Sequence, residues 1–318
     1  MKINRFMIAA PKSGSGKTMI TCALLQLLKD SGKNVLSYKC GPDYIDPMFH
    51  KKVLGVPSKN LDTFFTDEKT TVQLFLDERA DGDFAVLEGV MGLYDGLGGI
   101  YEQGSSYHLA KVTQTPIILV VDAKGMGKSV LALIAGFLQY DTQHLIKGVL
   151  INRMSKGYYD IIKPLIEKEL SVKVVGYFPE QKDIGLSSRH LGLVMPDELS
   201  DIKKQLNETA DRLKKTIDMD LFIDIAEAAD EIGDSESADK DKRQTLKNAE
   251  LMRPQDQNNT VNIAVAMDEA FCFYYEDNLR MLEKCGAKLQ YFSPLHDTSL
   301  PENCDAMLLG GGYPELYA

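Results

Sequence analysis

Residues 9–18 read AAPKSGSGKT and decide the fold class of this chain. An apolar run, Phe6–Ala10, leads into the glycines, and a segment of helical period, Lys17–Asp30, follows them. A glycine-rich turn between a strand and a helix surrounds a phosphate with backbone N–H groups and with the positive end of the helix dipole. In such a loop a lysine reaches the β/γ-phosphates and a hydroxyl binds Mg²⁺. The stretch therefore predicts an ATP site, in variant form because Pro11 stands where the strict motif has glycine.

The residues expected to contact the nucleotide share this loop, apart from one at the end of a later strand. They are Lys12, Ser13, Gly14, Ser15, Gly16, Lys17, Thr18 and Asn152.

Short apolar runs alternate with helical stretches along the first 180 residues. Continuously apolar runs such as Ile117–Val121 are typical of parallel strands that helices cover on both faces. The pattern predicts an α/β P-loop sheet with ligands at the carboxyl ends of its strands. The predicted strands are Phe6–Ala10, Asn34–Tyr38, Asp83–Leu87, Pro116–Val121, Ile146–Ile151 and Val172–Tyr177, and the predicted helices are Lys17–Asp30, Asp67–Arg79, Ser105–Gln114, Gly127–Tyr140 and Tyr158–Leu170.

Acidic residues follow two of these strands. GPDYIDP (41–47) brings Asp43 and Asp46 three residues apart, a spacing that suits Mg²⁺ or substrate alignment, although Asp-Pro is equally a turn signal. EGVMGLYDG (88–96) starts with Glu88 at the tip of the third predicted strand, where a P-loop ATPase places its Walker-B carboxylate. We expect Thr18, Asp46 and Glu88 to be the metal ligands. The loop 188–193 (SRHLGL) offers a cation for an anionic substrate or is a simple capped loop.

The texture changes after about residue 193. Residues 197–229 read as one charged amphipathic helix, and residues 231–260 have almost no large apolar side chains, as expected of a linker. New α/β elements then begin: strands at 261–267, 288–292 and 307–309 and a helix at 275–285. The predicted organisation is a synthetase domain (1–195), a charged helix (196–230), a linker (231–260) and the start of a second α/β domain (261–318). Gly311 and Gly312 could offer N–H groups to an oxyanion.

Composition excludes several classes of protein. Residues 197–260 hold 17 acidic and 10 basic side chains, so this segment carries seven of the ten net negative charges. No basic run could neutralise a nucleic-acid backbone, and no apolar run is long enough for a membrane span or a signal peptide. The five cysteines form neither a CxxC pair nor a disulfide pattern, which suggests reduced thiols in the cytoplasm.

Taken together, GPDYIDPMFH, EGVMGLYDG, SSYHLAK, RHLGL, AFCFYY, FSPLHD and GGGYPELYA resemble the cobyrinic acid a,c-diamide synthase family, in the same order along the chain. Members join a dethiobiotin-synthetase-like ATPase domain to a class I glutamine amidotransferase domain. The resemblance implies ATP- and Mg²⁺-dependent amidation of the a and c carboxylates of a corrinoid in cobalamin biosynthesis, with ammonia from glutamine. It also implies that the catalytic residues are Lys17, Asp43, Tyr44, Asp46, Glu88 and Asp95.

Three alternatives stay open on the sequence. Cobyric acid synthase has the same architecture, although DYIDP and EGVMGLYDG favour the a,c-enzyme, and nickel-sirohydrochlorin a,c-diamide synthase shares these motifs. A partition-type nucleotide-switch ATPase would explain Lys12, which in those proteins reaches a neighbour's nucleotide across a homodimer; Lys12 is otherwise an ordinary loop lysine. None of the cysteines lies in a nucleophile elbow, so we expect the glutaminase domain to be incomplete in this chain.

Overall fold

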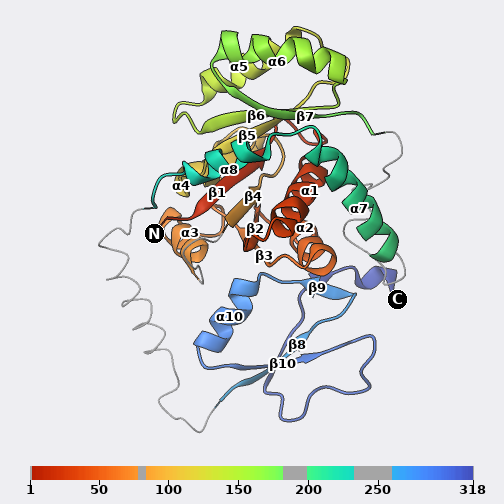
Figure 1. The fold of residues 1–318 in the computed structure, drawn as a ribbon. Coiled ribbons are helices and arrows are strands. Elements are labelled where there is room, and N and C mark those ends of the chain that lie inside the picture. Colours follow the sequence, from red (N-terminus) through yellow and green to blue (C-terminus); the bar gives the residue numbers. More distant parts are fainter. Residues whose placement is uncertain (1, 78–83, 182–198, 233–259, 318) are drawn as a thin grey trace. The chain divides into compact units, whose positions relative to one another are not determined.

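The computed structural model describes residues 2–77, 84–181, 199–232 and 260–317 (Figure 1). The chain divides into two compact units, residues 1–233 and residues 234–318. No helix in the described ranges has the length and hydropathy needed to cross a bilayer. The 188–193 loop and nearly all of the predicted linker at 231–260 lie outside the described residues.

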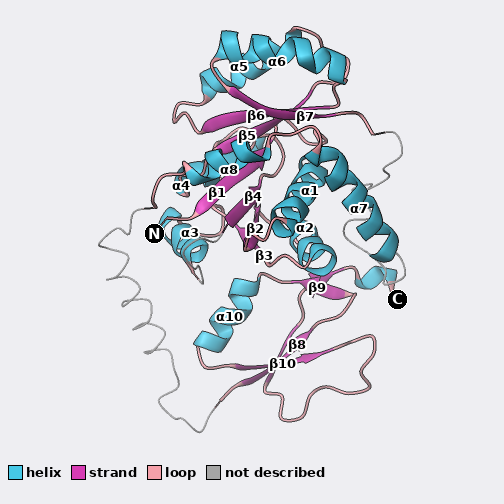
Figure 2. Ribbon diagram, in the orientation of Figure 1, coloured by secondary structure: helices cyan, strands magenta, loops and turns pink. Residues whose placement is uncertain are grey.

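Unit 1 is built on a seven-stranded sheet in which every neighbouring pair is parallel (Figure 2). The strand order is β3-β2-β4-β1-β5-β6-β7, so the first strand lies at the centre. The strands are β1 Asn4–Ala9, β2 Val35–Cys40, β3 Ser58–Leu61, β4 Phe84–Glu88, β5 Ile117–Asp122, β6 Ile146–Asn152 and β7 Lys173–Phe178. Because all seven run the same way, the loops that follow them emerge at one edge of the sheet.

Helices cover both faces of this sheet. β1 shows why: Phe6 and Ile8 belong to one hydrophobic core, while Met7 and Ala9 belong to the other. The first core is closed by α1 (Lys17–Asp30), α7 (Leu199–Lys214) and α8 (Met219–Glu227), and the second by α3 (Glu68–Leu76), α4 (Ser106–Val112), α5 (Ser129–Tyr140) and α6 (Lys156–Leu170). This is the predicted P-loop α/β fold.

Three short elements next to β2 were not predicted. α2 (Ile45–Phe49) runs directly into a π-helical turn, η1 (His50–Leu54), and β3 has the sequence SKNL. Five-residue helices and a strand with one apolar residue give no periodic signal. Because β3 was missed, Glu88 ends the fourth strand of the chain and not the third.

The prediction of a single helix over 197–229 is wrong. α7 ends at Lys214, and α8 begins at Met219 with the carboxylate of Asp218 accepting a hydrogen bond from the Leu221 N–H (3.0 Å). Between them, Ile217 forms a β-bridge with Gly176 of β7. Backbone pairing with the sheet edge therefore breaks a segment whose charge pattern alone reads as continuous.

The end of α8 is tied to the start of the chain by a buried arginine. Arg5, fully buried in β1, donates to the carbonyl oxygens of Ile3 (2.9 Å), Thr113 (3.1 Å), Gln114 (3.0 Å) and Asp230 (2.7 Å). Phe222 of α8 packs edge-on against Phe6, with ring centroids 5.6 Å apart. These contacts make α8 part of the same core as β1.

Unit 2 contains a three-stranded parallel sheet of order β10-β8-β11 and an antiparallel pair of β9 with β12. Its elements are β8 Asn262–Ala266, β9 Phe271–Phe273, α10 Glu276–Lys284, β10 Lys288–Phe292, β11 Ala306–Leu308 and β12 Gly311–Gly312. The helix and the three strands of the larger sheet match the predicted second α/β region. The buried core among its described residues is small: Ala264, Ala266 and Phe292, with Phe271 and Cys304 packed against it.

Candidate functional site at the carboxyl edge of the sheet

The phosphate loop lies between β1 and α1 and is held in shape by a later strand. Gly14 and Gly16 have positive φ values of 74° and 89°, which glycine adopts without strain. The Asn152 amide at the end of β6 donates to the Ser15 carbonyl (2.8 Å), and a Cβ at Gly16 would lie 2.4 Å from that amide nitrogen. Asn152, predicted as a nucleotide contact, here braces the loop that would hold the phosphates.

Lys17 is almost fully buried inside this loop. Its ammonium donates to the carbonyls of Met91 (2.6 Å) and Lys12 (3.4 Å). Burial lowers the pKa of Lys17 most, Glu88 acts to raise it, and Lys39 lowers it further. The Lys17 side chain is thus held by neutral carbonyls, which an anionic phosphate can replace.

A compact group of charged side chains lies beside the loop, drawn from α1, β2, α2 and β4. The Thr18 hydroxyl donates to Glu88 Oε1 (2.7 Å) and lies 3.5 Å from Asp46 Oδ2. The structure thus brings together the three residues expected to bind metal. Lys39 Nζ stands among them, bonded to Asp46 and to Glu88 Oε1 (2.9 Å), and lies 3.4 Å from Asp43.

The sequence interpretation missed Lys39. The available signal was a lysine near the end of an otherwise mostly uncharged strand, VLSYKC, two residues before GPDYIDP. Lys39 is buried, as are Asp46 and Glu88. Burial alone would lower the Lys39 pKa, but the three surrounding carboxylates raise it well above the usual value, so the ammonium stays charged.

The group carries an excess of negative charge. One ammonium is shared by Asp43, Asp46 and Glu88, and the Asp46 pKa is raised, first by burial and then by repulsion from Glu88. No ready-made cluster of three metal-ligating side chains occurs in the described part of the chain. Mg²⁺ at nucleotide sites uses one or two protein oxygens together with phosphates and waters, so a hydroxyl, two carboxylates and unmet negative charge fit it.

The loop 41–47 is braced from both ends. The Asp43 carboxylate accepts hydrogen bonds from the N–H groups of Ile45 (3.0 Å) and Asp46 (3.3 Å), which starts α2. Asn60 of β3, also missed, donates to the carbonyls of Gly41 (2.9 Å) and Asp43 (2.8 Å). Tyr44 is partly buried at the start of this helix.

The loop after β4 connects Lys17 to Asp95. Gly92 follows Met91, whose carbonyl binds Lys17, and the Gly92 N–H donates to Asp95 Oδ2 (2.9 Å). A Cβ at Gly92 would lie 2.7 Å from the Pro11 carbonyl, so this glycine is needed for the close approach. Asp95 accordingly stands beside the phosphate loop, whereas Lys12 and Ser13 on that loop are exposed.

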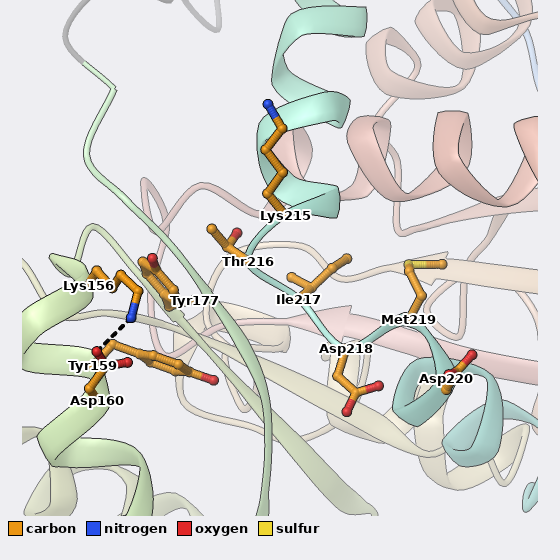
Figure 3. A pocket seen from close by; sticks show the side chains of 10 residues that line it. All are labelled: Lys156, Tyr159, Asp160, Tyr177, Lys215, Thr216, Ile217, Asp218, Met219 and Asp220. Carbon is orange, nitrogen blue, oxygen red and sulfur yellow. Dashed lines mark hydrogen bonds and ion pairs between the residues drawn. The ribbon is translucent and has the colours of Figure 1, made fainter.

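Two cavities of similar size lie away from the phosphate loop itself. One, of about 550 Å³, extends from Asp95 along α5 and has Tyr94, Ile100, Leu133, Gly136, Phe137 and Tyr140 in its walls. The other, of about 540 Å³, contains none of the predicted site residues (Figure 3). Its side chains come from the start of α6, the end of β7 and the α7–α8 turn, with Tyr159 stacked on Tyr177 (4.3 Å) and Lys156 bonded to Asp160 (2.7 Å).

In unit 2 the two predicted oxyanion glycines form strand β12. Gly311 pairs with Phe273 and Gly312 with Phe271, and a Cβ at Gly312 would lie 1.8 Å from the Ala270 carbonyl. The Gly310 N–H donates to the Tyr274 hydroxyl (2.7 Å), which itself donates to Ala266 (2.6 Å). Close backbone packing therefore accounts for Gly312, and an oxyanion role for Gly311 and Gly312 stays a prediction.

Comparison with known proteins agrees with this geometry. Residues 6–194 match the family model described as the CobQ/CobB/MinD/ParA nucleotide binding domain, and residues 262–318 match the CobB/CobQ-like glutamine amidotransferase domain. The chain is 38% identical over 318 residues to a cobyrinate a,c-diamide synthase of Listeria innocua, which covers 99% of this chain and 67% of that protein. It is 40% identical over 319 residues to the enzyme of the same name from Thermoplasma acidophilum, covering 100% of this chain and 68% of the relative. The nucleotide-binding domain match lies within unit 1, and the amidotransferase match lies within unit 2. The chain therefore belongs to the cobyrinate a,c-diamide synthase family.

Proposed function

We propose that the chain catalyses the ATP-dependent amidation of the a and c carboxylates of cobyrinic acid, through acyl-phosphate intermediates. The observation that carries the proposal is the buried charge group of Lys17, Lys39, Asp46 and Glu88 next to the phosphate loop. The identity of 38–40% to the named synthases over the whole chain supports the choice of substrate.

The chemistry calls for a site of this kind. A carboxylate is a poor electrophile for ammonia, because oxide is a very poor leaving group. Attack of a carboxylate oxygen on the γ-phosphorus of ATP breaks the bond to ADP and gives an acyl phosphate; ammonia then attacks the carbonyl carbon and inorganic phosphate leaves. Two anions have to meet in the first step, so the protein must position them and balance their charge.

Each residue of the group has a role in this step. Lys17 exchanges its carbonyl partners for the β/γ-phosphates, and the glycine-rich loop supplies N–H donors. Thr18, Asp46 and Glu88 would hold Mg²⁺, which supplies positive charge for the phosphates when it is bound. Lys39, freed from Asp46 and Glu88, balances charge on the incoming carboxylate or on the transferred phosphoryl group. Asp43, Tyr44 and Asp95 lie on the two loops that frame this position.

The cavity beside Asp95 suits the remainder of the substrate. Its walls are mostly aromatic and aliphatic, and a tetrapyrrole presents a broad apolar face with carboxylates only at its rim. Asp95 connects this cavity to the phosphate loop through Gly92. We place the macrocycle here, with a peripheral carboxylate extended toward Lys17 and Lys39.

We assign unit 2, which matches the glutamine amidotransferase domain, the role of providing ammonia from glutamine. In this proposal the reaction takes place in the cytoplasm, where the five free thiols would stay reduced. The exposed Lys12 is available for contact with a second copy in a homodimer.

The test separates the ATP-dependent half-reaction from glutamine hydrolysis. Purified chain is incubated with ATP, MgCl₂, ammonium chloride at mildly alkaline pH and cobyrinic acid, and ADP and amide products are followed together. The expected result is one ADP for each amide formed, that is one per monoamide and two per diamide, and only when the macrocycle is present. Acceptance of nickel sirohydrochlorin in place of cobyrinic acid would move the assignment to the nickel-sirohydrochlorin enzyme. ATP hydrolysis at the same rate with and without either macrocycle would support a nucleotide switch.

A further inference from the structure

Two buried polar atoms face each other behind the charge group. His50 Nε2 and Glu88 Oε2 lie 3.8 Å apart, and both side chains have no solvent exposure. Neither atom has a hydrogen-bond partner among the described residues. Buried polar groups without partners are rare in folded proteins and call for an explanation.

The other side of the imidazole contacts two serine hydroxyls. Ser37 Oγ lies 2.9 Å from His50 Nδ1, and Ser58 Oγ lies 3.5 Å from the same atom. A serine hydroxyl that donates to Nδ1 leaves the proton on Nε2, the atom that faces the carboxylate. In that arrangement Nε2 is an N–H donor directed at the Glu88 carboxylate.

The two oxygens of Glu88 are thus divided between two surroundings. Oε1 accepts hydrogen bonds from Thr18 and Lys39 on the side of the phosphate loop, while Oε2 faces His50. A separation of 3.8 Å is too long for a hydrogen bond and too short for a bridging water, so a small rotation of either side chain closes it directly.

We propose that His50 is a positioning residue for Glu88, donating from Nε2 to Oε2 when Mg²⁺ and nucleotide bind and so holding Oε1 toward the metal. The inference rests on the proposed function, because that function makes Glu88 a metal ligand. Partners of this kind orient metal-binding side chains in many enzymes, and their loss typically weakens metal binding by about 10–100-fold.

The test uses two replacements of similar length and shape. Gln at position 50 keeps an N–H donor near the Nε2 position, whereas Met has none. Calorimetric titration with ADP, first in EDTA and then in MgCl₂ or MnCl₂, gives the gain in affinity that the metal provides. We expect His50→Met to reduce this gain about tenfold with little change in the metal-free affinity, and His50→Gln to restore most of it.

Unfolding temperature without ligand serves as the structural control. If His50→Met does not fold, Ser37→Ala takes its place, since it removes the hydroxyl nearest to His50 Nδ1; it should reduce the metal-dependent gain in the same direction. Equal gains for the Met and Gln variants, or a wild-type gain in Ser37→Ala, overturn the inference.

Glu88→Gln distinguishes this failure from a failure of the proposed function. If Glu88→Gln abolishes the metal-dependent gain but His50→Met leaves it intact, only the role of His50 is wrong. If Glu88→Gln also leaves it intact, Glu88 is not a metal ligand and the assigned metal site fails with it.

Discussion

Unit 1 has charged side chains near strand ends in two places, one buried and one exposed to solvent. At the ends of β2 and β4, Lys39 and Glu88 are buried in a group that holds more carboxylates than ammonium groups. In the groove beside β7, Lys156 and Asp160 form an ion pair whose side chains are 74% and 53% exposed. Burying the first group of charges costs free energy because the charges lose their hydration. The second pair keeps its hydration, so this cost is small there. Charge kept at such a cost indicates the reacting site, although the two cavities near these regions are almost equal in volume.

The largest effect is expected at Lys17. We expect Lys17→Ala to lower ammonium-dependent amidation by about 10³-fold, because the developing phosphoryl charge loses its buried ammonium. Lys156→Ala, from the exposed groove, is the matched control and should leave the rate unchanged. Both are measured as ADP release with cobyrinic acid. A folded Lys17→Ala chain with wild-type turnover would contradict the nucleotide assignment.

The next effect concerns stability in acid. The His50 pKa of about 4 lies below its unfolded value near 6.5, so between these values the unfolded chain binds more protons and the free energy of unfolding rises with pH. The stabilisation is present above pH 6.5 and is lost as the pH falls toward 4. Between pH 7 and pH 4.5 the wild type should lose about 2–3 kcal/mol more than His50→Gln does.

Denaturant unfolding followed by circular dichroism at the two pH values measures this difference. The exposed His144 supplies the control, because His144→Gln should lose as much stability in acid as the wild type. Parallel losses in wild type and His50→Gln would mean that His50 does not titrate as its burial requires.

Glu88→Gln should reduce kcat about 100-fold while changing ADP affinity without metal by less than about threefold. The amide keeps the size of the side chain but removes the charge that balances Lys39 and the metal. Asp160→Asn makes the same chemical change in the exposed groove and should have no effect. Unchanged turnover and unchanged Mg²⁺ dependence would make Glu88 a structural residue.

The smallest effect tests the cavity along α5. A Cβ at Gly136 meets no atom within 4 Å, and the same is true of Gly157 at the start of α6. Gly136→Leu should raise the KM for the macrocycle about tenfold by filling the cavity, with the KM for ATP unchanged. Gly157→Leu is the control on the other helix. Equal KM values in both variants would place the macrocycle elsewhere.

The fold and the phosphate loop could be predicted because each depends on a local signal. Buried parallel strands are continuously apolar, and the loop 9–18 fixes its own chemistry through glycines, lysine and threonine. Asp46 and Glu88 were found because both follow strands, and parallel strands bring their ends together. The roles assigned to the site residues are still predictions.

Lys39, His50 and Asn60 were missed for a different reason. Each matters through a partner on another element: Lys39 with Glu88 of β4, His50 with Ser37 of β2, and Asn60 with the carbonyls of the 41–47 loop. The residues next to His50 and Asn60 reveal neither partner, and the sequence beside Lys39 points to the 41–47 loop but not to Glu88. The same limit explains the false single helix, since its break at Ile217 is set by a strand more than forty positions earlier in the chain.

The hydrogen bond from Arg5 to Asp230 also has a consequence for biosynthesis. It joins residues 225 positions apart, and α8 covers the same central strand through Phe222. The ribosome makes β1 first, yet the apolar surface over Phe6 gains its last cover only after α8 has left the exit tunnel. Nascent chains of intermediate length therefore present this surface to chaperones. A shortened gene that stops before Met219 would leave every chain in that condition permanently.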